Sequence, residues 1–97
     1  MITLHIEHAI TDYGVWRAAF DRLSTIRCEA GVVGERVARP VDDPRHIVLD
    51  LDFDSTERAA SFLHFLETEV WASATSAPAL DGRPSTTILA PAAPVGG

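Results

Sequence analysis

The chain of 97 residues contains no lysine, no asparagine and no glutamine, and all eight of its basic residues are arginine. Any mechanism that depends on a lysine amine or a side-chain amide is therefore excluded. Alanine is abundant, and we interpret the bias as codon usage in a GC-rich genome. The bias still limits the possible functional groups, because the polar and reactive side chains that remain are those of His, Asp, Glu, Arg, Ser, Thr, Tyr, Trp and one Cys.

Cysteine and long apolar segments are also scarce. Cys28 is the only cysteine, so the chain cannot form an internal disulfide. No apolar run approaches the length of a membrane span or the core of a signal peptide. We therefore expect a cytoplasmic protein that has no membrane partner.

Positive charge is scarce as well. The formal net charge is -6, and the arginines are spread along the chain without forming a basic patch. Nucleic acids need clustered cations to neutralise their phosphates, so we exclude DNA and RNA as partners.

The composition is that of a small folded domain, with 46% hydrophobic and 23% charged residues. We expect one domain over residues 1–90. A chain of this length builds only a modest core, so burial of a sheet face against a second copy would add stability. Residues 91–97 are Pro, Ala, Val and Gly with nothing to bury, which predicts a mobile tail.

The most informative segment is 46–54, which reads HIVLDLDFD. Successive strand side chains point to opposite faces, so the two residue types separate. Ile47, Leu49, Leu51 and Phe53 fall on one face, and Val48, Asp50 and Asp52 fall on the other. The pattern predicts a central strand that is covered by helices on its apolar side and carries two carboxylates on its other side.

The remaining periodicity and turn signals predict seven more segments. A two-faced strand covers 2–7, and a helix with Asp12 as its N-cap continues to Gly31. A second helix over 55–73 has Asp54 as its N-cap, with Glu57 completing a capping box. The other predicted elements are an extended segment over 32–41, a turn at 42–45, a loop over 77–84 and a last strand over 85–90.

This order, βαββαβ, predicts a ferredoxin-like α+β fold. Right-handed crossovers place both helices on one face of a four-stranded antiparallel sheet with strand order 4-1-3-2. The opposite face of the sheet then stays open. Its predicted central residues are Thr3, His5, Glu7, Val48, Asp50 and Asp52.

Proline suggests the register of the central hairpin. Pro44 suits the second position of a four-residue turn, so the turn would run from Asp43 to His46. Counting outward places Arg39 opposite Asp50, where the two charges attract each other. A slip of one residue would move Arg39 to the core side, which is costly for an unpaired charge. We therefore predict an Arg39–Asp50 pair.

Several interpretations of this polar face remain open. His5, Glu7, Asp50 and Asp52 could form a cross-strand network that orders a dimer interface. His5 could instead be a general base that a neighbouring carboxylate holds in place. The same mixture of imidazole and carboxylates could bind a divalent metal, although His-x-Glu and Asp-x-Asp are common strand patterns and we expect no metal.

Trp71 is the predicted wall of a binding pocket. It falls off the main apolar stripe of the second helix, where a core tryptophan would lie, so we expect it to contact a ligand. Glu7 and Asp52 are expected to complete the substrate contacts.

Three segments resemble the dimeric α+β-barrel superfamily, which includes antibiotic-biosynthesis monooxygenases, some polyketide cyclases and heme-degrading enzymes. The segments are DYGVWRAAF (12–20), RPVDDPRHIVLDLDF (39–53) and FLHFLETEVW (62–71). The resemblance implies a homodimer in which two sheets face each other, with a pocket inside the barrel or between each sheet and its helices. Heme-degrading members use an Asn, Trp and His trio, and the absence of asparagine argues against that activity.

The function that the resemblance implies is a small enzyme acting on a hydrophobic or aromatic molecule, similar to the cofactor-independent monooxygenases. In this hypothesis His5 removes a proton from a phenolic or enolic substrate, and Arg39, held by Asp50, stabilises the oxyanion. No cofactor is expected. The alternatives are a non-enzymatic ligand-binding or structural dimer, and a cyclase-like or isomerase activity. The sequence does not specify the substrate.

Overall fold

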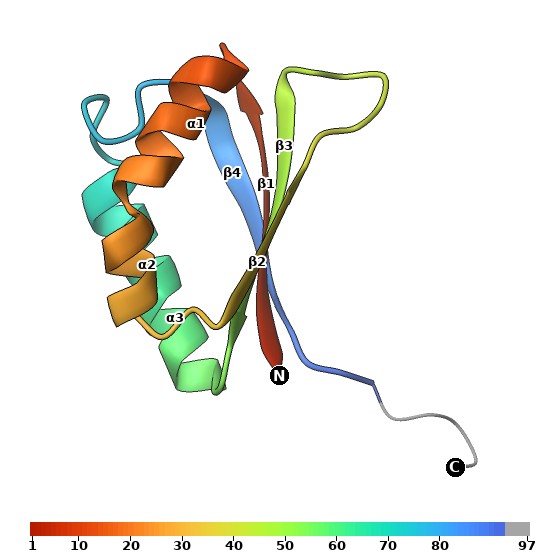
Figure 1. Cartoon of the computed structure of the whole chain (residues 1–97), viewed down its shortest axis with the longest axis vertical. Helices are drawn as coiled ribbons and strands as arrows, with labels where there is room; N and C mark the ends of the chain where they lie inside the picture. Colours follow the sequence, from red (N-terminus) through yellow and green to blue (C-terminus); the bar gives the residue numbers. More distant parts are fainter. Residues whose placement is uncertain (93–97) are drawn as a thin grey trace.

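The computed structural model describes residues 1–92 and is built on a four-stranded antiparallel sheet (Figure 1). The strand order is β2-β3-β1-β4, which confirms the predicted ferredoxin-like order 4-1-3-2. In chain order the elements are β1 (Ile2–Ile10), α1 (Tyr13–Arg22), α2 (Ser24–Glu29), β2 (Gly34–Ala38), β3 (His46–Phe53), α3 (Thr56–Phe65), the π-helix η1 (Leu66–Val70) and β4 (Leu80–Leu89).

The helices all lie on one side of the sheet, and the other side is left uncovered (Figure 1). Burial alternates residue by residue along β1 and β3, as the sequence predicts. Leu4, Ile6, Leu51 and Phe53 are essentially inaccessible to solvent and form the centre of the core. We call the uncovered side the open face.

The first predicted helix is interrupted. Asp12 caps α1 as expected, since its carboxylate accepts a hydrogen bond from the Val15 amide at 2.9 Å. A single continuous helix is wrong, however, because the backbone leaves the helical conformation at Leu23 before α2 begins. The Phe20 carbonyl accepts hydrogen bonds from the Leu23 amide and from the Arg27 side chain, so it is not available to continue the α-helical ladder.

The cap of the second predicted helix is Ser55, not Asp54. The Ser55 hydroxyl accepts from the Arg58 amide at 3.2 Å, so the capping pair begins one residue later than the sequence suggested. After Phe65 the helix widens into the π-helix η1, in which the Trp71 amide donates to the Leu66 carbonyl at 2.7 Å. π-helical turns often occur at functional sites. This one sets the position of Trp71.

The last strand is longer than predicted and contains a bulge. β4 starts at Leu80 and includes Asp81-Gly82, which the sequence had suggested as a separate turn. Between the pairs Glu7–Ser85 and Ala9–Asp81 the register shifts, so residues 82–84 oppose His8 alone. Gly82 has φ +83°, a conformation that glycine adopts without steric cost.

Within residues 1–92, every helix is too short or too polar to cross a bilayer. The predicted tail over 91–97 lies outside the described residues from residue 93 onward.

Replacing Phe53 by Ala should lower the free energy of unfolding by about 3–5 kcal/mol, because the ring is fully buried and its loss leaves a cavity. The matched control is Val15→Ala on α1, where the side chain is 45% exposed and the expected change is below about 0.5 kcal/mol. Urea unfolding at equilibrium measures both. Equal effects of the two substitutions would contradict the assignment of the core.

Candidate functional site

The hairpin between β2 and β3 has a different register from the one predicted. Arg36 lies opposite Asp50, and Val37 lies opposite Leu49. The predicted Arg39–Asp50 pair is therefore wrong. Residues 39–45 form a longer connection than the four-residue turn inferred from Pro44, and the register moves by three residues. An odd shift exchanges the two faces, so Val37 packs against the core.

Arg39 lies beyond the end of β2 on the helix side of the sheet. Its guanidinium carbon is 4.2 Å from the centre of the Tyr13 ring, a cation–π contact. The sequence analysis had rejected the helix side because it would bury the charge of Arg39. The charge is not buried there, because Arg39 is exposed at the edge of the sheet. An arginine does face Asp50 on the open face, but it is Arg36.

A double-mutant cycle tests this register. The effects of the substitutions Arg36→Ala and Asp52→Asn on the free energy of unfolding should not be additive, because the two side chains form a bidentate pair. The control cycle pairs Arg39→Ala with Asp50→Asn and should show no coupling. Coupling only in the control cycle would restore the register inferred from Pro44.

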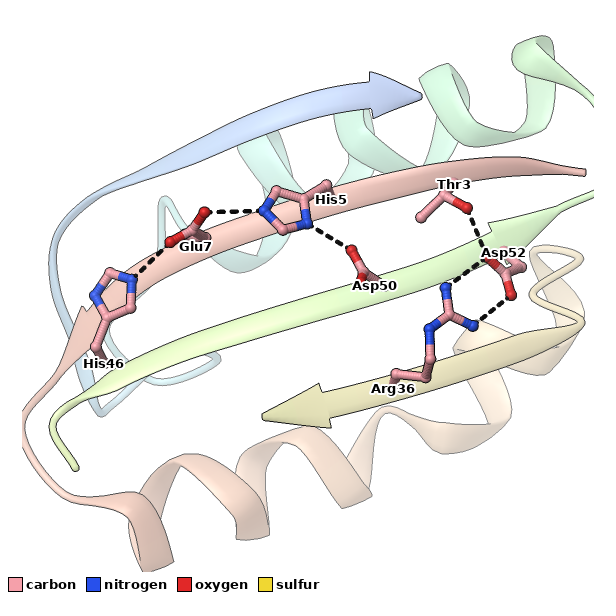
Figure 2. Close-up of polar contacts among 7 residues, drawn as sticks. All are labelled: Thr3, His5, Glu7, Arg36, His46, Asp50 and Asp52. Atoms are coloured by element: carbon pink, nitrogen blue, oxygen red, sulfur yellow. Dashed lines mark hydrogen bonds and ion pairs between the residues drawn. The ribbon is translucent and has the colours of Figure 1, made fainter. Parts of the chain in front are cut away.

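The open face carries two groups of polar contacts across β1, β2 and β3, shown in Figure 2. One group joins His46, Glu7, His5 and Asp50, and the other joins Thr3, Asp52 and Arg36. We call the two groups together the open-face network. The open face thus holds four of the six residues that the sequence proposed for the site, together with Arg36 and His46, which the sequence analysis had not assigned to it.

His5 is held between two carboxylates. Its Nδ1 lies 2.6 Å from Asp50 Oδ1, and its Nε2 lies 2.9 Å from Glu7 Oε2. An ionised carboxylate only accepts hydrogen bonds, so the two contacts are both made when the ring is protonated and both of its nitrogens donate. The hydrogen bonds to Glu7 and then to Asp50 raise the pKa of His5 above its usual value. In this arrangement neither nitrogen has a lone pair available to take a proton from a ligand.

Glu7 joins His5 to a second imidazole. His46 Nε2 lies 3.1 Å from Glu7 Oε1, so the glutamate accepts from both histidines. The hydrogen bonds from His5 and then from His46 lower the pKa of Glu7. The carboxylate is therefore ionised at neutral pH and accepts a hydrogen bond from each ring.

Asp52 is the centre of the second group of contacts on the open face. Arg36 donates two hydrogen bonds to it, at 2.8 and 3.1 Å, and the Thr3 hydroxyl donates a third at 2.7 Å. These donors, Arg36 foremost, lower the pKa of Asp52 to about 2. Among residues 1–92 no three His, Cys, Asp or Glu side chains are grouped so that they could hold a metal ion.

The pKa shift of His5 predicts a pH dependence of stability. A raised pKa means that the stabilising contribution is complete below about pH 6.5, the unfolded value, and is lost as the pH rises through the folded value. The stability advantage of the wild type over His5→Gln should therefore shrink between about pH 6 and pH 9. Unfolding free energies at fixed protein concentration measure it. The exposed His64→Gln is the control, and an advantage that grows with pH would contradict the network.

Trp71 lies on the opposite side of the sheet from His5. It lines a cavity between the sheet and the helices, which we call the helix-side cavity. The cavity has a volume of about 70 Å³, several times the roughly 10–15 Å³ that one water molecule needs. The residues around it are Ile6, His8, Trp16, Ala19, Phe20, Leu23, Arg27, Leu49, Leu51, Phe62, Leu66, Val70, Trp71, Ser76, Ala77, Pro78, Ala79 and Leu80.

Stacked aromatic rings form one wall of this cavity. Trp16 stacks on Phe20 with ring centres 4.9 Å apart, and Tyr13 stacks on Trp16 at 6.0 Å. The buried guanidinium of Arg27 lies 3.5 Å from the centre of the Phe20 ring, and its Nε donates to Glu35 at 2.8 Å. The wall is therefore mostly apolar, and the paired guanidinium of Arg27 also lines the cavity.

His8 is the functional candidate that the sequence reasoning missed. Its side chain is 5% exposed and lines the helix-side cavity, with its ring centre 6.3 Å from that of Trp16. Nδ1 lies 3.0 Å from the Ala9 carbonyl oxygen, and burial lowers the pKa of the ring. The signal was present in the sequence, since extending the alternation of β1 past Glu7 places His8 between Ile6 and Ile10 on the apolar face.

The predicted site is thus divided between two faces. His5, Glu7, Asp50 and Asp52 lie on the open face, whereas Trp71 lies in the helix-side cavity. Arg39 joins neither group, because it stacks on Tyr13 at the edge of the sheet. The open face offers a polar surface whose histidine and carboxylate groups are paired with one another or with Arg36, and the cavity offers a mostly apolar space lined by His8 and by the paired guanidinium of Arg27.

Comparison with known proteins identifies the fold. No family model matches the sequence, and no curated protein matches it significantly. Solved structures match over nearly the whole chain. A protein from Bordetella bronchiseptica provisionally assigned as an antibiotic biosynthesis monooxygenase has a TM-score of 0.70 and 12% identity, over 95% of this chain and 97% of the other. An antibiotic biosynthesis monooxygenase has a TM-score of 0.66 and 13% identity, over 96% and 100%.

A third similar structure is a dimeric ferredoxin-like protein from an uncultured marine organism, with a TM-score of 0.63 and 9% identity, over 97% of each chain. At these identities the similarity concerns the fold. The resemblance found in the sequence is therefore confirmed at that level: this chain has the ferredoxin-like α+β fold of the antibiotic-biosynthesis-monooxygenase-like proteins.

Proposed function

We propose that this chain is a small enzyme that binds a hydrophobic or aromatic molecule in the helix-side cavity and oxidises it with molecular oxygen, without a cofactor. The observation that carries the proposal is the cavity itself. It lies between the sheet and the helices and is walled by the stacked rings of Trp16 and Phe20, with Trp71 also lining it. Small-molecule sites in proteins are typically concave, apolar and largely preformed.

The shape of the cavity favours an aromatic ligand. Aromatic side chains contribute most when another ring can stack on them or meet them edge to face. Trp71 is partly exposed and also lines a shallower hollow beside β4, so it lies where a ligand would enter. A planar apolar molecule would therefore contact Trp71 first and then the Trp16–Phe20 wall.

The names of the similar structures favour oxygenation as the reaction class. A phenolate or enolate is electron-rich enough to reduce O2 directly. In such a monooxygenation a C–H carbon becomes a carbonyl, one oxygen atom enters the product and the other leaves as water. The protein then needs to bind the substrate, exclude water and assist its ionisation.

We assign the open face to a homodimer interface. The polar contacts of His5, Glu7, Asp50 and Asp52 are directed at one another, which suits a surface that becomes covered. Two of the similar structures are named dimeric ferredoxin-like proteins. The catalytic role suggested for His5, with Arg39 and Asp50, stays a prediction, and the geometry favours a structural role for these residues.

A non-enzymatic ligand-binding dimer is the second candidate. It is favoured by the same cavity, because binding needs only the apolar walls and not the proton transfer. A cyclase or isomerase would use the cavity without consuming oxygen. Oxygen uptake therefore separates the monooxygenase from the other two, and conversion of the ligand without oxygen uptake separates a cyclase or isomerase from a binding protein.

The test uses 1-naphthol, which monooxygenation converts to 1,4-naphthoquinone and water with one O2 consumed. Oxygen uptake above the uncatalysed rate and one atom of ¹⁸O in the quinone are expected from the wild type. Trp71→Ala should weaken naphthol binding by about tenfold, or 1.4 kcal/mol, through the lost ring contact. The control His64→Ala, at an exposed position on α3, should match the wild type.

Tight binding of 1-naphthol without oxygen uptake would favour the ligand-binding dimer. The absence of any binding of 1-naphthol, or of simpler aromatic molecules, to the wild type would overturn the proposed function.

A further inference from the structure

We propose that Nε2 of His8 accepts the proton of a ligand hydroxyl in the helix-side cavity, so that the cavity selects aromatic molecules with an acidic O–H group. This inference rests on the proposed function, since it concerns the same cavity. It adds a proton acceptor to the site and moves the base from the open face to the cavity.

The tautomer of His8 follows from its backbone contact. Nδ1 lies 3.0 Å from the carbonyl oxygen of Ala9. A carbonyl oxygen can only accept a hydrogen bond, so Nδ1 carries a hydrogen and donates it. In the neutral ring the lone pair is then on Nε2.

Nε2 is not paired with a protein group. Among residues 1–92 it has no hydrogen-bond partner, since the only polar contact of the His8 ring is the one to Ala9. Every unpaired side-chain nitrogen or oxygen of a buried residue in that range keeps some accessible surface, so Nε2 can be reached by a small molecule. Because His8 lines the helix-side cavity, its lone pair is available to a molecule bound there.

The surroundings of His8 keep the ring neutral before a ligand binds. Ile6 and Ile10 flank it on β1, and the buried Ile47 lies across from it on β3. Trp16 of α1 is its aromatic neighbour. The apolar environment lowers the pKa of the ring, with burial as the largest cause.

Arg27 is the one charged side chain among the described residues that line the same cavity as His8, and it is paired with Glu35. The other charged and titratable groups near His8 belong to other surfaces. His46, across from Ala9, points to the open face and bonds Glu7. On β4, beside the bulge that opposes His8, Asp81 and Arg83 are both exposed. Tyr13 on α1 stacks on Trp16. No carboxylate therefore competes with a ligand for Nε2.

The proton step is simple. The O–H bond of the ligand breaks, an N–H bond forms at Nε2, and the electron pair stays on the ligand oxygen. The product is an imidazolium–phenolate pair in contact. The hydrogen bond from Nδ1 to the Ala9 carbonyl favours the positive ring, because a charged donor makes the stronger bond. In the apolar cavity the two charges stabilise each other more than they would in water.

The experiment uses 4-nitrophenol, whose phenolate absorbs at a longer wavelength than the neutral phenol, and nitrobenzene as the matched ligand without a hydroxyl. At about pH 6.5, where the free phenol is mainly neutral, the wild type should bind 4-nitrophenol largely as the phenolate. In His8→Phe the phenolate fraction of the bound probe should fall by about tenfold or more. Nitrobenzene should bind both proteins with similar affinity, and His64→Gln should behave as the wild type.

A direct measurement covers the case in which His8→Phe does not fold. The ¹⁵N chemical shift of His8 Nε2 in the wild type should move to the protonated value with 4-nitrophenol and stay unchanged with nitrobenzene. Binding of 4-nitrophenol as the neutral phenol, with Nε2 unprotonated, would overturn the role of His8 and leave the cavity as a binding site. Failure of both probes to bind would instead overturn the proposed function.

Discussion

The structure depends on the pairing of β1 with β3 in a single register. Leu4 pairs with Leu51 and His5 pairs with Asp50, so apolar residues meet on one face and polar residues on the other. A slip of one residue would turn the core side chains to the open face and the carboxylates toward the helices. The cost of burying those charges fixes the register and thereby fixes both candidate surfaces.

The features that the sequence predicted correctly follow from local sequence patterns, of which this alternation is the most important. The period of two in β1 and β3 identified the central strands, the ferredoxin-like order and the shared face of His5 and Asp50. The Asp12 cap was likewise readable, because a cap depends on residues only three apart. Such properties need no knowledge of how distant segments meet.

The errors concern positions that depend on loops. β2 has a weak pattern, in which Val37 is the one partly buried aliphatic residue, so hydrophobicity could not choose between registers. The register was therefore inferred from Pro44 alone. That inference was wrong because the connection between β2 and β3 is longer than a four-residue turn. His8 was missed for a related reason: it stands at the β4 bulge, where the pattern of β1 continues past the expected end of the strand.

His5 and His8 are three residues apart on the same strand, yet their surroundings shift their pKa values in opposite directions. His5 faces two carboxylates that stabilise its charge, so its pKa is raised. His8 faces apolar groups that penalise the charge, so its pKa is lowered and one nitrogen keeps its lone pair. The sheet separates the two environments. A partner covering the open face would therefore leave the cavity accessible, and substitutions that alter the interface need not alter the chemistry of the ligand site.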